Sequence, residues 1–154
     1  MIRTSRPAWI IAGLIAVVVF SAVSLSAAKD EIVFDDVKAQ TQQFMEWEKT
    51  IRLTPEQEAV KKAALTAMPA PCCDDNSAYT CCCSCNVSRT IWGLSNFMIA
   101  EQGADAKMIQ AKVNEWITFV NPNGFSGRTC YTRGCGRAFK HDGCGGMRRS
   151  QVVF

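Results

Sequence analysis

The residues best suited to chemistry in this chain are its cysteines. There are nine in 154 residues, and none occurs among the first 71. Six of the nine fall within fourteen residues, namely Cys72, Cys73, Cys81, Cys82, Cys83 and Cys85. The last four immediately precede a predicted helix, and the free N–H groups and dipole of a helix start stabilise anions and lower thiol pKa values. The thiolate is the form of cysteine that binds metals and attacks disulfides.

The first interpretation of this cluster is a metal site. Its C-x-C-x-C spacing permits chelation by neighbouring residues, and sulfur-rich ligand sets suit Cu(I), Zn²⁺ and Fe–S clusters. We predict that the chain binds or handles a transition metal, with copper as the first candidate and zinc as the second. The predicted ligands are Cys81, Cys83 and Cys85, with Cys82, Cys72 or Cys73 completing the set.

Two alternatives stay open. In the first, Cys82 and Cys85 form a redox-active C-x-x-C pair, which would make the chain a thiol–disulfide oxidoreductase that acts on a partner protein. In the second, the cysteines are structural disulfides without metal, as is usual in small exported domains. Adjacent cysteines rarely bond to each other without strain, so the crowded sulfurs would then need distant partners. We expect Cys130, Cys135 and Cys144 to form structural disulfides in either case.

Other kinds of catalysis find no matching motif. His141 is the only histidine, so no convincing Ser-His-Asp set can be assembled, and phosphate-loop and dinucleotide patterns are absent. The haem-attachment pattern C-x-x-C-H fails because Asn86 follows Cys85. The sequence therefore favours a binding protein over a hydrolase or transferase, and it leaves open whether the chain is an enzyme.

The N-terminal segment 1–28 predicts export. Arg3 and Arg6 precede an apolar run that leads into a segment rich in serine and alanine. These are the parts of a secretory signal, although residues 8–28 also have roughly the length that spans a bilayer. The segment is thus a cleaved signal or a retained membrane anchor. We predict a bacterial protein of the periplasm or the cell exterior, free or attached to the inner membrane, with a protein partner in the cell envelope.

Residues 29–154 are predicted to form one all-α domain of three to four helices. Apolar residues recur at helical spacing over 31–52, and Thr54 and Pro55 are a helix-start signal. The helix that they start should end at Pro69.

A helical hairpin should follow the cysteine-rich loop. Apolar residues step by three and four over 87–98 and again over 109–120. Gly103 is placed to end the first of these helices and Asp105 to cap the second. Each apolar stripe needs a partner, so we expect the two helices to pack on each other and on the 31–52 helix.

The tail after Gly124 differs in composition from the helices. Residues 124–147 contain seven glycines, three cysteines and few large apolar side chains, so this segment cannot order itself by burial alone. We therefore predict a glycine-rich, disulfide-braced tail. The tail is also basic, but its arginines are not interleaved with stacking aromatics, and an exported protein rarely meets nucleic acid. No nucleic-acid partner is predicted.

The cysteine motif resembles that of a known family. Cys81-Cys82-Cys83-Ser84-Cys85 preserves the cysteine spacing of the Pro-Cys-Tyr-Cys-Gly-Cys motif of exported bacterial proteins of unknown function, which are often lipid-anchored. The similarity covers roughly 80–120 and implies export and a helical pair after the motif. The chain departs from the motif at Thr80, Cys82 and Ser84, where the family has Pro, Tyr and Gly. A second similarity is to the thiol-oxidoreductase subunit of cytochrome c maturation, in which a C-x-x-C precedes a helical hairpin.

Overall fold

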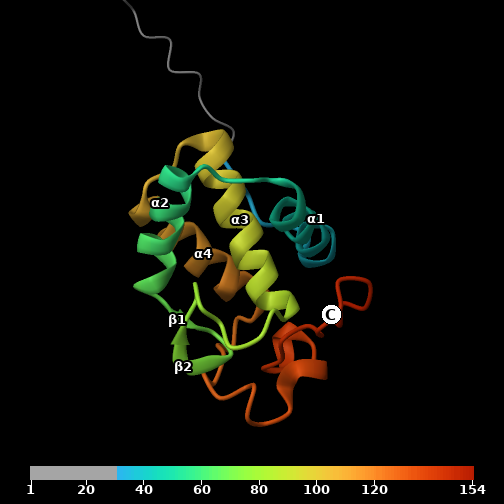
Figure 1. The fold of residues 1–154 in the computed structure, drawn as a ribbon. Coiled ribbons are helices and arrows are strands. Elements are labelled where there is room, and N and C mark those ends of the chain that lie inside the picture. The colour runs from blue at the N-terminus through green and yellow to red at the C-terminus, as the bar shows by residue number, and fades with distance from the viewer. Residues whose placement is uncertain (1–30) are drawn as a thin grey trace, which may run out of the picture.

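Four α-helices and a short β-hairpin form the regular structure in a computed structural model that describes residues 31–154 (Figure 1). In chain order they are α1 (Val37–Thr50), α2 (Pro55–Thr66), β1 (Pro69–Ala70), β2 (Cys73–Ser77), α3 (Asn86–Gln102) and α4 (Ala106–Val120), then short 3-10 turns at Gly134–Gly136 and Phe139–His141. The mainly helical prediction is confirmed. The predicted signal or anchor lies outside the described residues, within which no helix is long and apolar enough to cross a membrane.

The helix ends lie close to where capping signals placed them. Thr54 accepts a hydrogen bond from the Gln57 N–H, and the Gln57 side chain accepts one from the Thr54 N–H, which completes a capping box at the start of α2. Gly103 closes α3 in the left-handed conformation with φ 60°. Asp105 accepts a hydrogen bond from the Met108 N–H and so caps α4.

The first helix is shorter than predicted. It begins at Val37, not near residue 31, because Asp36 has an extended backbone and caps the helix by accepting a hydrogen bond from the Ala39 N–H. The Gln40 side chain then accepts hydrogen bonds from the N–H groups of Asp35 and Asp36 and donates one to the Val33 carbonyl. These bonds hold the segment before α1 in an extended form. The apolar residues of this segment are spaced along the sequence as in a helix, but their backbone is extended.

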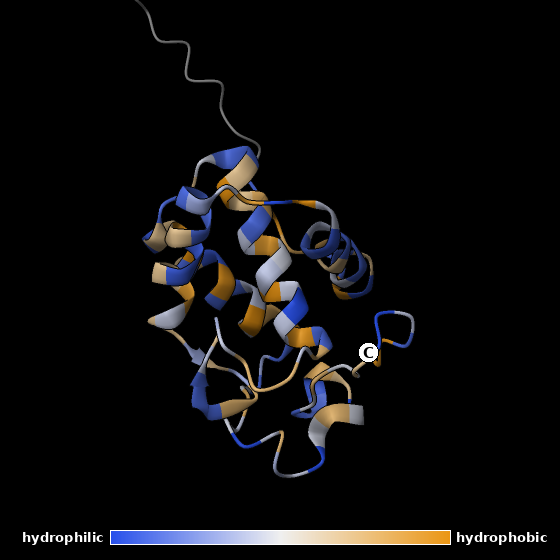
Figure 2. Cartoon of the chain, in the orientation of Figure 1, coloured by the Kyte–Doolittle hydropathy of each residue, from blue (hydrophilic) through white to orange (hydrophobic). Residues whose placement is uncertain are grey.

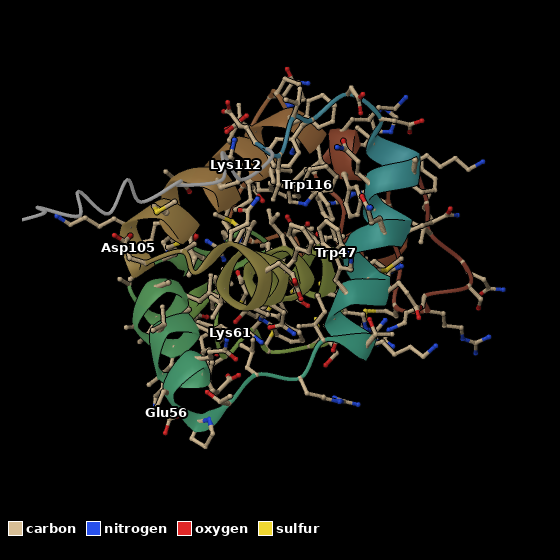
Figure 3. All side chains as sticks on the ribbon, turned by 90° about the horizontal axis from the view of Figure 1, so that it is seen from above. Trp47, Glu56, Lys61, Asp105, Lys112 and Trp116 are labelled. Carbon is tan, nitrogen blue, oxygen red and sulfur yellow. The ribbon has the colours of Figure 1, made fainter. Side chains whose placement is uncertain are left out.

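Helix α3 lies at the centre of the helical layer and packs most closely against α1 (Figure 1). Gly93 permits this close approach, since a Cβ there would lie 1.7 Å from the Phe44 carbonyl oxygen of α1. The core between these helices is aromatic: Phe44 meets Trp116 of α4 edge-on at 4.8 Å between ring centroids. Figure 2 shows the hydrophilic residues on the outer faces of the helices, and Figure 3 shows Trp116 and Trp47 between α1 and the rest of the bundle.

The β-hairpin corrects the all-α prediction. Strands β1 and β2 pair antiparallel, with Pro69 opposite Ser77 and Ala70 opposite Cys73. The second strand reads Cys-Asp-Asp-Asn-Ser, which lacks the alternation of apolar and polar residues that marks a half-buried strand. Its pairing comes from the tight turn and not from side-chain pattern. Sequence periodicity could not have revealed it.

The tail is ordered by hydrogen bonds and not by disulfides, which corrects the predicted disulfide bracing. All nine cysteines lie in the described residues, and all nine are free thiols. The N–H groups of Asn86 and Val87 in the first turn of α3 donate to the carbonyls of Gly146 and Cys144, at 2.9 and 3.1 Å. The tail thus caps α3, whose N-cap residue makes no side-chain capping bond. Every helix start leaves backbone N–H groups unpaired, and here those N–H groups order the tail by hydrogen bonding to it.

Candidate metal centre

Three segments meet beneath the start of α3: the β-hairpin, the loop 81–85 that follows it closely, and the tail, which is far from both in the sequence. Figure 1 shows these segments gathered at one end of the helices. Two backbone hydrogen bonds join the tail to the hairpin, from the Cys130 N–H to the Cys72 carbonyl at 3.1 Å and from the Asp74 N–H to the Gly127 carbonyl at 2.7 Å. Every cysteine of the chain belongs to one of these segments. Their convergence therefore concentrates sulfur at a single place.

The first group of sulfurs, the inner triad, consists of Cys72, Cys81 and Cys85. Their Sγ atoms lie within 4.8 Å of one another, and the Sγ atoms of Cys72 and Cys81 are 3.6 Å apart. Cys72 and Cys85 are fully buried, and Cys81 is half-buried. The triad lies directly at the N-terminus of α3, because Cys85 is the N-cap residue of that helix.

The second group, the outer triad, consists of Cys82, Cys83 and Cys130. Cys130 Sγ lies 3.7 Å from Cys82 Sγ and 3.9 Å from Cys83 Sγ, and the last two are 4.0 Å apart. Cys82 is exposed, whereas Cys83 and Cys130 are half-buried. Solvent and other proteins can therefore reach the outer triad.

A third set of three, the linking triad, connects the first two. It consists of Cys72, Cys130 and Cys144, whose Sγ atoms again lie within 4.8 Å of one another. Cys144 is fully buried and also in hydrogen-bonding contact with Cys85. The three triads together contain seven of the nine cysteines.

The spacing of these sulfurs matches that of metal-bound thiolates. A metal–sulfur bond of about 2.3 Å places two ligands about 3.8 Å apart around a tetrahedral ion and about 4.0 Å apart around a trigonal one. The three Sγ–Sγ distances of the outer triad, 3.7–4.0 Å, and the Cys72–Cys81 distance of 3.6 Å in the inner triad lie close to these values. Cys85 Sγ lies within 4.8 Å of the other two inner sulfurs, so it would move by about 1 Å or less to complete an inner site. A disulfide, with sulfurs about 2.05 Å apart, would need both side chains to move closer.

The inner group concentrates negative charge on Cys85. Hydrogen bonds from Cys144, Cys72 and Cys81 lower the pKa of the Cys85 thiol, against the opposing effect of burial, and the Ser88 N–H adds to the lowering. Hydrogen bonding with Cys144 contributes most to raising the pKa of Cys72, and hydrogen bonding with Cys72 contributes most to raising that of Cys81. The first thiol to ionise thus makes ionisation of its neighbours harder. A bound cation reverses this order, because it stabilises every thiolate that touches it.

In the outer triad, the pKa values of Cys82 and Cys83 are both raised. Partial burial and a hydrogen bond with Cys130 raise the pKa of the Cys82 thiol to about 11. Burial and the neighbouring sulfurs, Cys85 first among them, raise the pKa of Cys83. Both outer thiols are therefore neutral at physiological pH without a metal ion. A metal would bind there by displacing their protons.

Two cysteines lie outside the triads. Cys73 Sγ accepts a hydrogen bond from Asn76 Nδ2 at 3.3 Å, which is the largest cause of its lowered pKa, and it lies 3.9 Å from the Tyr131 hydroxyl. A hydrogen bond with Cys82 places Cys73 beside the outer triad, although none of the three triads includes it. Cys135, in the first 3-10 turn, belongs to none of the triads found among residues 31–154.

The structure divides the predicted ligands between the two ends of the centre. Of the predicted C-x-C-x-C set, Cys81 and Cys85 lie in the inner triad and Cys83 in the outer one. The predicted redox pair is divided in the same way, since Cys82 is in the outer triad and Cys85 in the inner one.

Sequence reasoning missed Cys130 and Cys144 as members of the centre. Both were expected to form structural disulfides, yet both lie in sulfur triads as free thiols. One signal was present in the glycines at 145 and 146, which adopt positive φ and let the tail backbone approach the start of α3. A glycine pair next to a cysteine is a weak indication by itself, because it does not say which helix the backbone approaches.

Comparison with protein-family models, curated proteins and solved structures finds no match for this chain. The similarity to the Pro-Cys-Tyr-Cys-Gly-Cys family therefore stays a prediction from the sequence. What this protein does has to be inferred from its own residues.

Proposed function

We propose that this protein is an exported metal-binding protein that holds a soft or borderline transition metal through cysteine thiolates, with Cu(I) first and Zn²⁺ second. The observation that carries the proposal is the inner triad. Three sulfurs from two separate segments converge at a helix N-terminus, at spacings that fit a bound ion. Burial keeps competing ligands and water away from Cys72 and Cys85.

Copper is favoured over zinc by the number and kind of ligands. Thiolates select Cu(I), and three of them satisfy its trigonal coordination. Structural zinc sites are almost always four-coordinate. The outer triad offers three sulfurs, whereas the inner triad reaches four only by sharing Cys144 with the linking triad. Zinc therefore fits one end of the centre, and Cu(I) fits both.

The proposed location follows from the N-terminal segment. A secretory signal or anchor over residues 8–28 would place the domain in the periplasm or outside the cell, with or without attachment to the inner membrane. Free thiols are oxidised in that compartment unless something protects them. A bound metal provides that protection. The partner would be an envelope protein that delivers or receives the ion.

The test is competition for Cu(I) between the full-length, reduced protein and the chromophoric chelator bicinchoninate. The protein should withdraw copper from the chelator, and Cys72→Ser and Cys85→Ser should each weaken its affinity. Cys135→Ser is the matched control, since this thiol belongs to no triad, and it should bind as the unaltered chain does. The proposal is wrong if the reduced chain takes no Cu(I) or Zn²⁺ from a competing chelator.

A second function, thiol–disulfide exchange, is favoured by one observation: an exposed thiol lies close to a second thiol. Cys82 is exposed, and its Sγ lies 3.7 Å from Cys130 Sγ. The two could exchange a disulfide with an envelope protein, with the Cys82 thiolate attacking and Cys130 resolving the mixed disulfide. Because the pKa of Cys82 is raised to about 11, this attack should be slow at neutral pH and should speed up as the pH rises toward that value. In that case Cys130→Ser should trap a covalent complex with a partner through Cys82. Cys135→Ser should trap none.

A further inference from the structure

The three triads are not separate groups, because they share members. Cys72 belongs to both the inner and the linking triad, and Cys130 to both the linking and the outer triad. Following the shared sulfurs leads from the exposed Cys82 to the buried Cys85 without a gap longer than 4.8 Å between members of a triad. Seven sulfurs thus form one continuous group. A site built for a single ion would need only three or four of them.

Sulfur chemistry gives the shared members a role. A thiolate has more than one lone pair and can bridge two Cu(I) ions, which is how sulfur-rich sites hold several ions with few ligands. Cys72 and Cys130 are placed for such bridging, because each belongs to two triads. Each could therefore bind one ion in each of those triads. Several monovalent ions also offset the charge of several buried thiolates, which a single ion cannot do.

Exposure is greatest in the outer triad. Cys82 is exposed, Cys81, Cys83 and Cys130 are half-buried, and Cys72, Cys85 and Cys144 are each 0 % exposed. Because the outer triad holds the exposed thiol and no fully buried one, an ion that arrives with a donor protein or a small thiol meets this triad most readily. The buried sulfurs must be reached by ligand exchange within the group.

From these observations we propose that the seven cysteines form one polynuclear Cu(I)–thiolate cluster that is filled from the outer triad, with Cys130 and Cys72 as bridging ligands. This inference rests on the proposed function and adds to it the number of ions and the direction of transfer. Each thiol that binds copper releases its proton to solvent, and copper stays Cu(I) throughout, so no oxidant or reductant is consumed. The seven ligands are Cys72, Cys81, Cys82, Cys83, Cys85, Cys130 and Cys144.

Native mass spectrometry of the full-length, reduced chain, titrated with Cu(I) as its glutathione complex, tests the proposal. We expect the unaltered chain to bind more than one Cu(I) and to pass from the empty to the multiply loaded form with little singly loaded species. Cys130→Ser removes a bridge and should lower the number of bound ions and increase the singly loaded species. Cys135→Ser should match the unaltered chain in both respects.

The direction of transfer is tested with Cys82→Ser. Because Cys82 is exposed, its replacement leaves the packing intact, and circular dichroism should be unchanged. Copper should still reach the inner triad, but loading from the glutathione complex should be slower than for the unaltered chain and for Cys135→Ser. Unchanged loading kinetics in Cys82→Ser would overturn the direction.

The failures of the two proposals can be told apart. If one Cu(I) binds tightly and no second ion follows, the cluster is wrong while the proposed function stands. If Cys130→Ser folds and keeps the full number of ions, the triads are independent and the bridging is wrong. If no copper binds at all, the proposed function fails together with the cluster.

Discussion

Replacing Asn86 by alanine should release the C-terminal tail from the start of α3. This side chain is fully buried, and its Nδ2 donates to the Gly145 carbonyl at 2.9 Å and to the Arg148 carbonyl at 3.0 Å. Its Oδ1 accepts a hydrogen bond from Arg89 at 3.1 Å. One side chain thus ties the segment that contains Cys144 to the helix that begins after Cys85.

The magnitude follows from those contacts. Each of the two amide hydrogen bonds contributes about 1 kcal/mol net. Both carbonyls keep a backbone donor in the variant, the Val153 N–H for Gly145 and the Gln151 N–H for Arg148, so the loss of stability should be about 2 kcal/mol. Asn86→Asp should cost at least as much, because it keeps the shape but turns a carboxylate oxygen toward two carbonyls. The backbone bonds from Asn86 and Val87 to the tail remain in both variants, so the fold itself should persist.

Urea unfolding of the reduced protein measures this loss directly, with Thr118→Ala as the control. The Thr118 hydroxyl donates only within α4, to the Asn114 carbonyl on an exposed face, and its loss should change stability by less than about 0.5 kcal/mol. A second readout is the alkylation of Cys144, which is buried in the unaltered chain and should react faster in Asn86→Ala. If Asn86→Ala matches Thr118→Ala in stability and Cys144 stays protected, the side chain does not hold the tail.

Three further predictions concern the helical layer. Gly93→Ala should destabilise the protein by about 2 kcal/mol or more in thermal or urea unfolding, because its Cβ would meet the Phe44 carbonyl at 1.7 Å and push α1 away; an unchanged midpoint would contradict the close packing. Trp116→Phe removes the Nε1 donor to the Thr90 hydroxyl at 2.9 Å and leaves a cavity, so it should cost about 2–4 kcal/mol in urea unfolding, and an unchanged midpoint would contradict the buried contact. Burial lowers the pKa of Lys61 against the raising effect of Glu58 and Glu48, so its positive charge opposes folding below its unfolded-state pKa of about 10.4. Lys61→Met should therefore raise the urea midpoint at neutral pH, and this gain should shrink as the pH rises toward that value; a lower midpoint at neutral pH would show that the ammonium is stabilising.

Local signals predicted the helices well. Thr54 with Pro55, Gly103 and Asp105 each act within one turn of their own position, so their effect can be predicted from a few neighbouring residues. The start of α1 was predicted too early because apolar spacing continued through a segment that the Gln40 side chain holds extended.

The composition of the centre depended on contacts that no local pattern describes. Cys130 reaches Cys82 across 48 positions of sequence, and the tail reaches Asn86 across 59. Adjacent cysteines such as Cys82 and Cys83 share the outer triad, whereas Cys83 and Cys85, two apart, are in different triads. Spacing along the chain therefore indicated that sulfur was concentrated here. It could not assign individual sulfurs to one ion or another.

The claim on which the whole account depends is that these sulfurs are open to a metal ion and not joined to one another. X-ray absorption at the copper edge, on full-length protein loaded with Cu(I) and freed of excess copper, tests it most directly. We predict a first shell of sulfur alone, with copper–sulfur distances of about 2.3 Å, and scattering from a second copper. A shell dominated by nitrogen or oxygen, or copper lost on desalting, would contradict the account.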